Sequence, residues 1–410
     1  MRGERVVITG MGAVSPYGRG VPAMLAGVRE NRCALSRLPE YRLEGLACRV
    51  AGLVPPLQEK IIPRELRRCM SPMSVFACLA AWEALEQAGL GRDPGRRMGA
   101  AVGSTLGSPA MLHDFFAAFL REHSVESMRS TVFFKVMGHT VAANTAQACG
   151  CSGRVLAPAA ACASGLVSIC LGYEAIAAGR ERLMLCGGAD EFHLLVPATF
   201  DRLGAASHEA DPECASRPFD AERTGLVCGE GAGILLLESL ESALERGVPI
   251  LGEVRGASMT ASASSIAHPD ATAIADCMRA ALEDARVRPC EVGYVNAHAT
   301  ATEYGDMAEG QAVAALFGAQ TCVSSLKGHL GHTMAASGAL ESILCVEMLR
   351  QSVYFPTRGL HTPDKRCGAL RHLVTPVRAG GGPALKNSFA LGGCNCAVLF
   401  DTFQQNSHDG

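Results

Sequence analysis

The sequence predicts an α/β protein whose sheets are buried between helices. Short apolar runs of strand length alternate along the 410 residues with longer stretches in which apolar residues recur every three or four positions. Apolar residues make up 48% of the chain but aromatic residues only 5%, so small side chains must fill much of the interior. Small side chains let helices and strands approach closely, which suits a layered fold of this length.

The strands are expected where apolar and β-branched residues form short runs between turn residues. In chain order these runs are residues 6–9, 98–102, 182–186, 233–238, 252–257, 292–296, 322–324 and 396–400. The helices are expected between them, where apolar side chains fall on one face at helical spacing, at residues 73–87, 166–178, 272–285, 306–317 and 335–349.

The chain also carries a coarse internal duplication. Residues 5–15 and 251–261 each consist of a strand-like run followed by glycine and other small residues, so each is expected to open an equivalent half. Arg246-Gly247-Val248-Pro249 is the candidate join between the two halves. The sequence therefore divides into an N-terminal half, residues 1–245, and a C-terminal half, residues 246–410.

Charge and cysteine usage narrow the class of protein. The net charge is −3 and no basic patch is interleaved with aromatic residues, which argues against nucleic-acid binding. The 18 cysteines are scattered through helix and strand patterns and no secretory signal precedes them, so a reducing, cytoplasmic compartment is expected. Residues 156–179 have the length of a membrane span and one charge, but Pro158 and many small residues favour two buried elements.

Cys162 lies in a run of small residues, Ala159-Ala160-Ala161-Cys162-Ala163-Ser164-Gly165, which leaves room for another molecule to reach its sulfur. A helical pattern begins directly after it, so Cys162 is expected on a tight turn at a helix N-terminus. Unpaired N–H groups and the helix dipole at that position are expected to lower the thiol pKa and favour the thiolate. The ordinary alternative for any one cysteine is a small buried apolar residue.

Two histidines and a lysine downstream favour a chemical role for this cysteine. His298 closes an apolar strand pattern and is followed by Thr300 and Thr302, whereas His332 ends a glycine-rich turn five residues after Lys327. A histidine alone is more often structural. Together with a poised thiol, however, two neutral imidazoles suit thioester chemistry, in which a thiolate accepts an acyl group and hydrogen bonds stabilise an oxyanion.

Other ligand-binding interpretations fit less well. The glycines of residues 9–15 and 228–233 resemble phosphate-binding turns, but the first is followed by Pro16 and the second by a strand, whereas a phosphate cradle must open a helix. Close backbone packing explains the second stretch better. The cysteine and histidine pairs lack the paired spacing of a zinc site, so no metal is expected.

At this point the chain resembles a β-ketoacyl-(acyl carrier protein) synthase, one of the condensing enzymes that share the thiolase fold. The motifs that carry the resemblance occur in order along almost the whole chain, at residues 7–12, 161–165, 215–220, 229–233, 294–298, 327–332 and 387–395. The resemblance implies a five-layered αβαβα fold built from two pseudo-duplicated halves. It also implies a dimer, either of two identical chains or with a subunit like a chain-length factor.

The resemblance implies a catalytic triad of Cys162, His298 and His332. Thiolases carry a second cysteine in place of His332, so decarboxylative condensation with malonyl-acyl carrier protein is favoured over cleavage of coenzyme A thioesters. Lys327, paired with Glu341, is expected to set the local electrostatics. The remaining implied roles belong to the backbone N–H groups of Cys162 and Leu391 as an oxyanion hole, and to Thr300 and Thr302 as contacts of the phosphopantetheine arm.

No cofactor is implied beyond that arm of the acyl carrier protein. Because the carrier is acidic, Arg64, Arg67 and Arg68, at helical spacing, are expected to form its docking face, although a solvated charged face is the simpler alternative.

Departures from the family pattern concern the substrate side. Leu391 stands where the family usually has a gating phenylalanine, Ala299 replaces a glycine, and His329 is additional. Leu106 and Leu391 are the candidate residues of the acyl pocket. These departures suggest a specialised type II polyketide or polyene pathway, with housekeeping fatty-acid elongation as the alternative. A non-catalytic chain-length subunit is disfavoured because such subunits characteristically lose the nucleophile.

Overall fold

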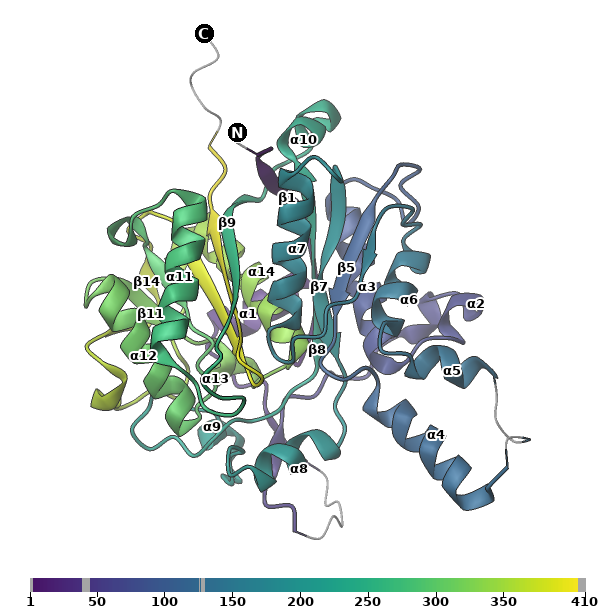
Figure 1. Ribbon diagram of the computed structural model, residues 1–410, viewed down its shortest axis with the longest axis horizontal. Helices are drawn as coiled ribbons and strands as arrows, with labels where there is room; N and C mark the ends of the chain where they lie inside the picture. Colours follow the sequence, from purple (N-terminus) through teal and green to yellow (C-terminus); the bar gives the residue numbers. More distant parts are fainter. Residues whose placement is uncertain (1–2, 39–44, 125, 127–129, 405–410) are drawn as a thin grey trace.

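The computed structural model describes residues 3–38, 45–124, 126 and 130–404. Hydrogen bonds join most of the described strands into one mixed sheet that runs through the molecule (Figure 1), in the order β13-β11-β10-β15-β16-β9-β1-β8-β7-β5-β6. The strands are β1 Val6–Ser15, β2 Gly18–Arg19, β3 Ser36–Arg37, β4 Val50–Ala51, β5 Gly99–Gly103, β6 Val155–Leu156, β7 Leu183–Asp190, β8 Gly231–Ser239, β9 Gly252–Ala261, β10 Tyr294–Asn296, β11 Cys322–Ser324, β12 Val353–Tyr354, β13 Arg371–His372, β14 Val377–Arg378, β15 Ala384–Ala390 and β16 Cys394–Asp401.

The helices lie on both faces of this sheet. They are α1 Val21–Arg29, α2 Arg64–Arg67, α3 Pro72–Gln87, α4 Pro109–Glu122, α5 Ser130–Val136, α6 Thr140–Ala148, α7 Ser164–Ala177, α8 Leu195–Arg202, α9 Pro212–Ala215, α10 Leu240–Arg246, α11 Ala271–Ala285, α12 Glu303–Phe317, α13 Lys327–Leu330 and α14 Ala335–Gln351. Among the described residues, no helix is both long and apolar enough to cross a membrane.

Two halves of the sheet meet where Val6–Ile8 of β1 pairs antiparallel with Gly252–Val254 of β9. Outward from this seam, the order β1-β8-β7-β5-β6 on one side matches the order β9-β16-β15-β10-β11 on the other. Helix α3 follows β1 as α11 follows β9, and α7 precedes β7 as α14 precedes β15. The strand and helix order of one half is therefore repeated in the other.

Five layers result from this repetition. Helices α7 and α14 pack against each other and against strands of both halves, so they form the central layer. Helices α3 and α6 cover the outer face of one half-sheet, whereas α11 and α12 pack against each other on the other and share a core with its strands (Figure 1). This is the thiolase-like αβαβα arrangement that the resemblance implies, and the α/β class that the residue patterns predict is confirmed.

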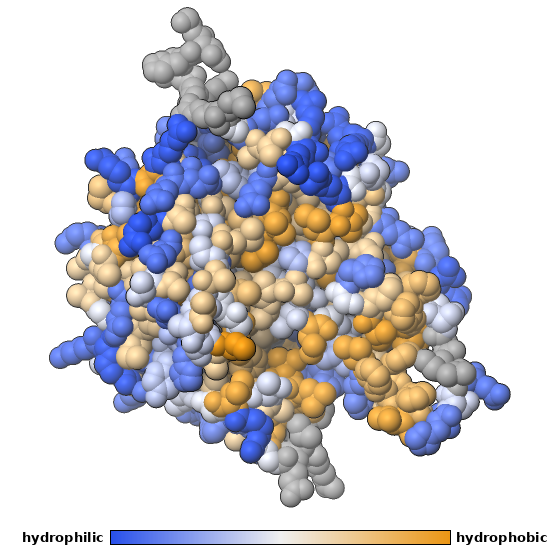
Figure 2. All heavy atoms as spheres, in the orientation of Figure 1, coloured by the Kyte–Doolittle hydropathy of each residue, from blue (hydrophilic) through white to orange (hydrophobic). Residues whose placement is uncertain are grey.

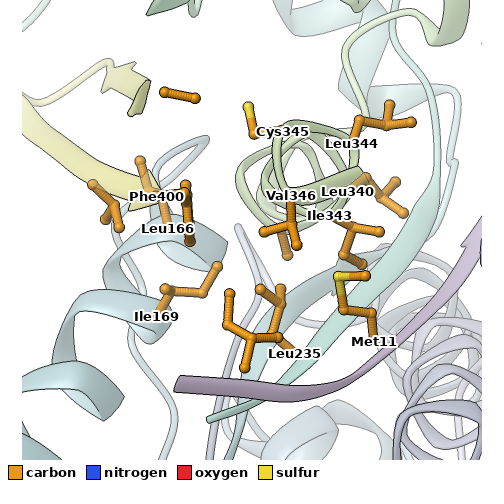
Figure 3. Packing of buried hydrophobic residues seen from close by; sticks show 14 of the residues in the cluster. Met11, Leu166, Ile169, Leu235, Leu340, Ile343, Leu344, Cys345, Val346 and Phe400 are labelled. Atoms are coloured by element: carbon orange, nitrogen blue, oxygen red, sulfur yellow. The ribbon is translucent and has the colours of Figure 1, made fainter. Parts of the chain in front are cut away.

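The largest apolar core surrounds the two central helices. Leu166 and Ile169 of α7 face Leu340 and Ile343 of α14, and strand residues such as Leu235 close the cluster (Figure 3). Burial of each large side chain stabilises the fold by about 1.5–3 kcal/mol. Helix α14 is buried from Ala335 to Leu349, as expected for a helix that is covered on every face.

The glycine-rich stretches belong to strands. Residues 9–15 continue β1, and a Cβ on Gly12 would lie 1.9 Å from the Ala80 carbonyl oxygen of α3. Glycine is required there because helix and strand backbones are in close contact, not because a phosphate binds. Residues 231–239 form β8, which confirms that the second stretch leads into a strand.

Candidate active site

A strained turn presents Cys162 directly before α7. Ala161 adopts a left-handed conformation with φ of 45°, which is uncommon for any residue but glycine, asparagine or aspartate. The hydroxyl of Ser164, in the first turn of the helix, accepts a hydrogen bond from the Ala160 N–H and donates one to the Ala161 carbonyl. The small residues of the motif thus build a fixed turn that holds the thiol, which is 6% exposed, at the start of the helix.

The structure corrects the expected ionisation of this thiol. Burial raises the pKa of Cys162 to about 12, and the carboxyl group of Asp190 adds to the increase. Lys327 and the backbone N–H of Cys162 lower that pKa by less. The prediction of a lowered thiol pKa is therefore wrong, because removal from water outweighs the favourable position at a helix N-terminus. The resting nucleophile is a neutral thiol whose proton must leave during acylation.

His298 is held by its backbone. The N–H groups of His298 and Ala299 donate hydrogen bonds of 2.8 and 2.7 Å to the two carboxylate oxygens of Glu309 on α12. The side-chain amide of Asn387, on β15, donates to the same carboxylate at 3.1 Å. Glu309 and Asn387 were missed by sequence reasoning; the signal was that Asn387 opens one of the recognised motifs.

His332 lies on the connection between α13 and α14. Its N–H donates to the Val227 carbonyl at 2.7 Å, and its own carbonyl accepts from the Gly229 N–H at 2.8 Å. The Nδ1 atom lies 3.0 Å from the hydroxyl of Ser337 on α14, which leaves Nε2 as the nitrogen available to a substrate. The rings of His298 and His332 are perpendicular, with centroids 5.2 Å apart.

Both imidazoles are neutral. Burial lowers the pKa of His298 and of His332 well below the usual value, and the ammonium group of Lys327 lowers both further. Among the described residues, the Nδ1 atom of His298 has no hydrogen-bond partner. A neutral imidazole offers one N–H donor without carrying a charge, as required to stabilise an oxyanion that forms and then disappears.

The crossing of the two central helices brings together the segments that carry Cys162 and His332. A Cβ on Gly165 of α7 would lie 2.2 Å from the Ala335 carbonyl oxygen of α14, so only glycine permits this approach. Asp190 at the end of β7 accepts a hydrogen bond of 2.8 Å from the Ala335 N–H and ties the same point to the sheet. Because α7 and α14 cross at their first turns, the residues that precede the two helices lie close together.

Buried charges surround the histidines. The Lys327 ammonium lies 2.7 Å from one carboxylate oxygen of Glu341, and Lys386 of β15 lies 2.6 Å from the other. All three side chains are at most 2% exposed. The sequence analysis expected the Lys327–Glu341 pair but missed Lys386, which stands alone among uncharged neighbours in residues 384–390 and gives no pattern from which burial could be inferred.

The apolar wall beside the thiol comes from other segments than the expected ones. Cys162 clusters with buried Leu226, Cys228 and Met334, and with the partly buried side chains of Phe192, Val196, Phe200 and Ala390. Leu106 is 60% exposed and Leu391 44% exposed, and neither belongs to this cluster. The structure of one chain therefore places both candidate pocket residues on its surface. The ring of Phe389 lies closer to the site, 6.4 Å from the ring of His298.

The remaining predicted residues lie in two places. Thr300 and Thr302 follow His298, and their hydroxyl oxygens are 3.1 Å apart. Arg64 and Arg67 bound the short helix α2, and Arg68 follows it. Within the described part of the chain, none of these three arginines forms an ion pair.

Comparison with known proteins gives the family. The model of the β-ketoacyl synthase N-terminal domain matches residues 3–243, and that of the C-terminal domain matches residues 251–361. Nodulation protein E of Rhizobium meliloti (strain 1021) is 35% identical over 404 residues, which cover 97% of this chain and 99% of that protein. 3-Oxoacyl-[acyl-carrier-protein] synthase 2 of Synechocystis (strain PCC 6803) is 32% identical over 422 residues, covering 98% of this chain and 99% of that protein.

A solved structure agrees with these relatives. A β-ketoacyl synthase from Burkholderia phymatum STM815 superposes with a TM-score of 0.94 at 38% identity, over 98% of this chain and 100% of that one. The chain belongs to the β-ketoacyl synthase family, and it is an acyl-transferring condensing enzyme.

Proposed function

We propose that this condensing enzyme joins an acyl group held on Cys162 to malonyl-acyl carrier protein, with loss of CO2, to give β-ketoacyl-acyl carrier protein. The observation that carries the proposal is a buried thiol packed with Cys228, which pairs with His332, together with two neutral, perpendicular imidazoles whose ring centroids are 5.2 Å apart. A thiol accepts the acyl group, and two uncharged N–H donors suit a developing enolate. No cofactor is needed beyond the phosphopantetheine arm that carries both substrates.

In the acyl-transfer step, the sulfur of Cys162 attacks the thioester carbonyl of an acyl-carrier protein. A new carbon–sulfur bond forms, the carrier thiol leaves, and it takes up the proton that Cys162 releases. The backbone N–H groups of Cys162 and Leu391 stabilise the tetrahedral oxyanion in this scheme. Because burial raises the pKa of the Cys162 thiol to about 12, loss of its proton is coupled to this attack.

In the condensation step, the bond between the malonyl carboxylate and its α-carbon breaks and CO2 leaves. His298 and His332 donate hydrogen bonds to the resulting enolate oxygen, and the enolate carbon attacks the acyl group on Cys162. The Cys162 thiolate departs as the new carbon–carbon bond forms. Thr300 and Thr302 hold the phosphopantetheine arm in this scheme, beside the neutral imidazole of His298, which they follow in the chain.

The acyl carrier protein is proposed to dock on the arginines of α2. Arg64 and Arg68 are exposed and Arg67 is half-buried, so all three guanidinium groups are accessible to an acidic partner. Reversal of charge at Arg64 and Arg68 should raise the KM for carrier-bound substrates about 10-fold and leave turnover of a pantetheine thioester unchanged. An equal loss with both substrates would argue against docking at α2.

The enzyme is proposed to act as a dimer. Strand β6 ends the sheet, with Val155 46% exposed, and α6 packs against both β6 and α5. Figure 2 shows apolar side chains gathered over α4 and α5, where Leu120 and Phe133 are 63% and 57% exposed. An unpaired strand edge beside such a patch is typical of a subunit interface. A partner there would cover this surface and with it Leu106, which precedes α4.

Whether that partner is identical or a chain-length-factor-like subunit is tested by mass. Light scattering of the purified chain should give twice its monomer mass, and Leu120→Asp should shift the protein towards the monomer. A monomeric wild type that becomes active only after addition of a second subunit would favour the heterodimer.

The pathway is proposed to be a specialised type II polyketide or polyene assembly line. Leu391 supports this, because its side chain is 44% exposed on the turn between β15 and β16 and lacks the flat face of a gating phenylalanine. Acyl-carrier proteins that differ in length and unsaturation should therefore acylate Cys162 at different rates. Equal rates on all saturated chains would favour housekeeping fatty-acid elongation.

The central experiment follows intact masses. The enzyme is incubated with an acyl-carrier protein, and then with malonyl-carrier protein. We expect acylated enzyme first, then free enzyme and a β-ketoacyl carrier, whereas Cys162→Ala should give neither species. Acylation that persists in Cys162→Ala would overturn the assignment of the nucleophile, and acylation without a β-ketoacyl product would overturn condensation.

A further inference from the structure

Lys386 is a buried lysine to which neither the resemblance nor the proposed reaction assigns a role. It lies on β15, in register with Asn296 of β10 and Val398 of β16, and it is 0% exposed. A lysine side chain is seldom removed from water entirely unless a partner compensates its charge. Its position therefore calls for an explanation in terms of the groups that surround it.

Two lysines share one carboxylate at this point. The Lys386 ammonium lies 2.6 Å from Oε2 of Glu341 on α14, and the Lys327 ammonium lies 2.7 Å from Oε1 and 3.0 Å from Oε2 of the same carboxylate. In their usual ionised forms these three groups carry a net positive charge. One lysine would suffice to neutralise Glu341, so the second leaves an excess cation in a region from which water is excluded.

The histidines are exposed to that excess charge. Lys386 is one of the cations that lower the pKa of both His298 and His332, after burial and Lys327. The other charged group that faces the cluster is Glu309 of α12, which already accepts hydrogen bonds from the backbone of His298 and Ala299. The neighbouring titratable groups on α14 and β10 are the Cys345 thiol and the Tyr294 phenol, and burial raises the pKa of both, which keeps them neutral.

Lys386 also holds the strand beside His298. Its ammonium donates to the carbonyl of Asn387, the residue whose side chain bonds Glu309. Phe389, two residues further on, brings its ring to 6.4 Å from His298. The same side chain therefore contacts the Glu341 carboxylate and the backbone of the strand that carries Asn387.

We propose that Lys386 is a positioning residue that acts through His298 and His332. By sharing Glu341 with Lys327 it keeps a positive potential at both imidazoles, so that they stay neutral and donate hydrogen bonds to the oxyanion. This inference rests on the proposed condensation only in one respect, namely that condensation explains why the imidazoles must be neutral. The effect of Lys386 on their ionisation does not depend on turnover.

The test measures histidine ionisation directly. Ring carbons of His298 and His332 are followed by NMR against pH in the wild type and in Lys386→Met, with resonances assigned from single histidine variants. Loss of the buried cation should raise the pKa of both rings by about one unit, because a nearby like charge disfavours the imidazolium. Lys386→Arg, which retains the charge, should titrate like the wild type, and so should Lys365→Met, which removes an exposed lysine.

Activity provides the second measurement. In Lys386→Met, the pH below which decarboxylation of malonyl-carrier protein is lost should rise by about one unit, whereas acyl transfer to Cys162 stays within about 2-fold of the wild type. Glu341 keeps Lys327 as its partner in this variant, so the fold is expected to persist, which circular dichroism checks. Unshifted histidine titrations, or equal losses in both half-reactions, would overturn the role of Lys386. A wild type that does not decarboxylate malonyl-carrier protein would refute the proposed function, and the NMR titration would still decide the role of Lys386.

Discussion

The two halves of this protein have the same order of strands and helices, yet they bring opposite kinds of chemistry to the site. Shortly before each central helix, one residue other than glycine has a positive φ. This residue is Ala161 before α7 and Met334 before α14. The N-terminal half places a thiol, on Cys162, directly after Ala161 and among apolar side chains. The C-terminal half places an imidazole, on His332, two residues before Met334.

Polar groups are also divided unequally. The C-terminal half supplies His298, His332 and the buried cluster of Lys327, Lys386 and Glu341. The N-terminal half supplies Asp190 near the thiol, and this carboxyl group raises the thiol pKa further. One backbone plan, repeated, thus separates an uncharged nucleophile from the groups that handle charge, and the crossing of α7 and α14 reunites them.

The contrast between an uncharged nucleophile in the N-terminal half and charged groups in the C-terminal half would fail if Cys162 were a thiolate. Because the thiolate is the reactive form and burial raises the pKa of Cys162 to about 12, alkylation by iodoacetamide should accelerate about 10-fold per pH unit, or about 1,000-fold from pH 7 to pH 10. The site of modification is followed by peptide mass spectrometry, with exposed Cys290 as the reference thiol in the same sample. If the rate of Cys162 alkylation were already constant above pH 7, the thiol would be ionised at neutral pH and the nucleophile would not be uncharged.

The assignment of charge handling to the C-terminal half is sharpened by His298→Ala. Loss of an oxyanion donor should reduce decarboxylation of malonyl-carrier protein about 100- to 1,000-fold, whereas acyl transfer to Cys162 should change little. Release of CO2 and intact mass report the two half-reactions separately. If acyl transfer falls as far as decarboxylation, the two halves do not divide the chemistry as we describe.

The contact between the two central helices, α7 and α14, is tested by Gly165→Ala. The new Cβ would lie 2.2 Å from the Ala335 carbonyl oxygen, so α7 and α14 must separate. We expect the free energy of unfolding to fall by about 3 kcal/mol, measured by urea denaturation. Gly380→Ala is the matched control, because nothing lies within 4 Å of the Cβ added there. Equal stability of the two variants would show that the central helices tolerate separation.

The sequence predicts those elements of the fold that depend on residues close together in the chain, and it misses those that depend on residues far apart. Periodicity locates α14 and β8 because their apolar patterns are local, and the small residues around Cys162 predict its turn. Strand β15 escapes prediction because Lys386, Asn387 and Ser388 interrupt its apolar pattern. The partners that make Lys386 and Asn387 tolerable there, Glu341 and Glu309, lie 45 and 78 positions away in the chain.

The same limit explains the errors at the site. The sign of the Cys162 pKa shift depends on burial beneath segments remote in sequence, which outweighs the local helix terminus. The apolar wall likewise comes from Phe192, Phe200 and Met334, which meet only in the folded chain. By contrast, the resemblance to a known family brings His298 and His332 into one hypothesis, because ordered motifs carry long-range information that periodicity lacks.

The smallest expected effects come from two serines at equivalent places, each in the first turn of a central helix. Ser164 bonds the backbone of the turn that holds Cys162, whereas Ser337 bonds the imidazole of His332. One hydrogen bond is worth about 1 kcal/mol, so Ser337→Ala should slow decarboxylation about 5-fold and leave acyl transfer unchanged. Ser164→Ala should instead slow acyl transfer about 30-fold, because its turn loses two hydrogen bonds. Both half-reactions are measured on both variants by CO2 release and intact mass. If both variants slowed the same half-reaction, Ser164 and Ser337 would not serve different steps. The contrast between the two halves would then reduce to the choice of Cys162 before α7 and His332 before α14.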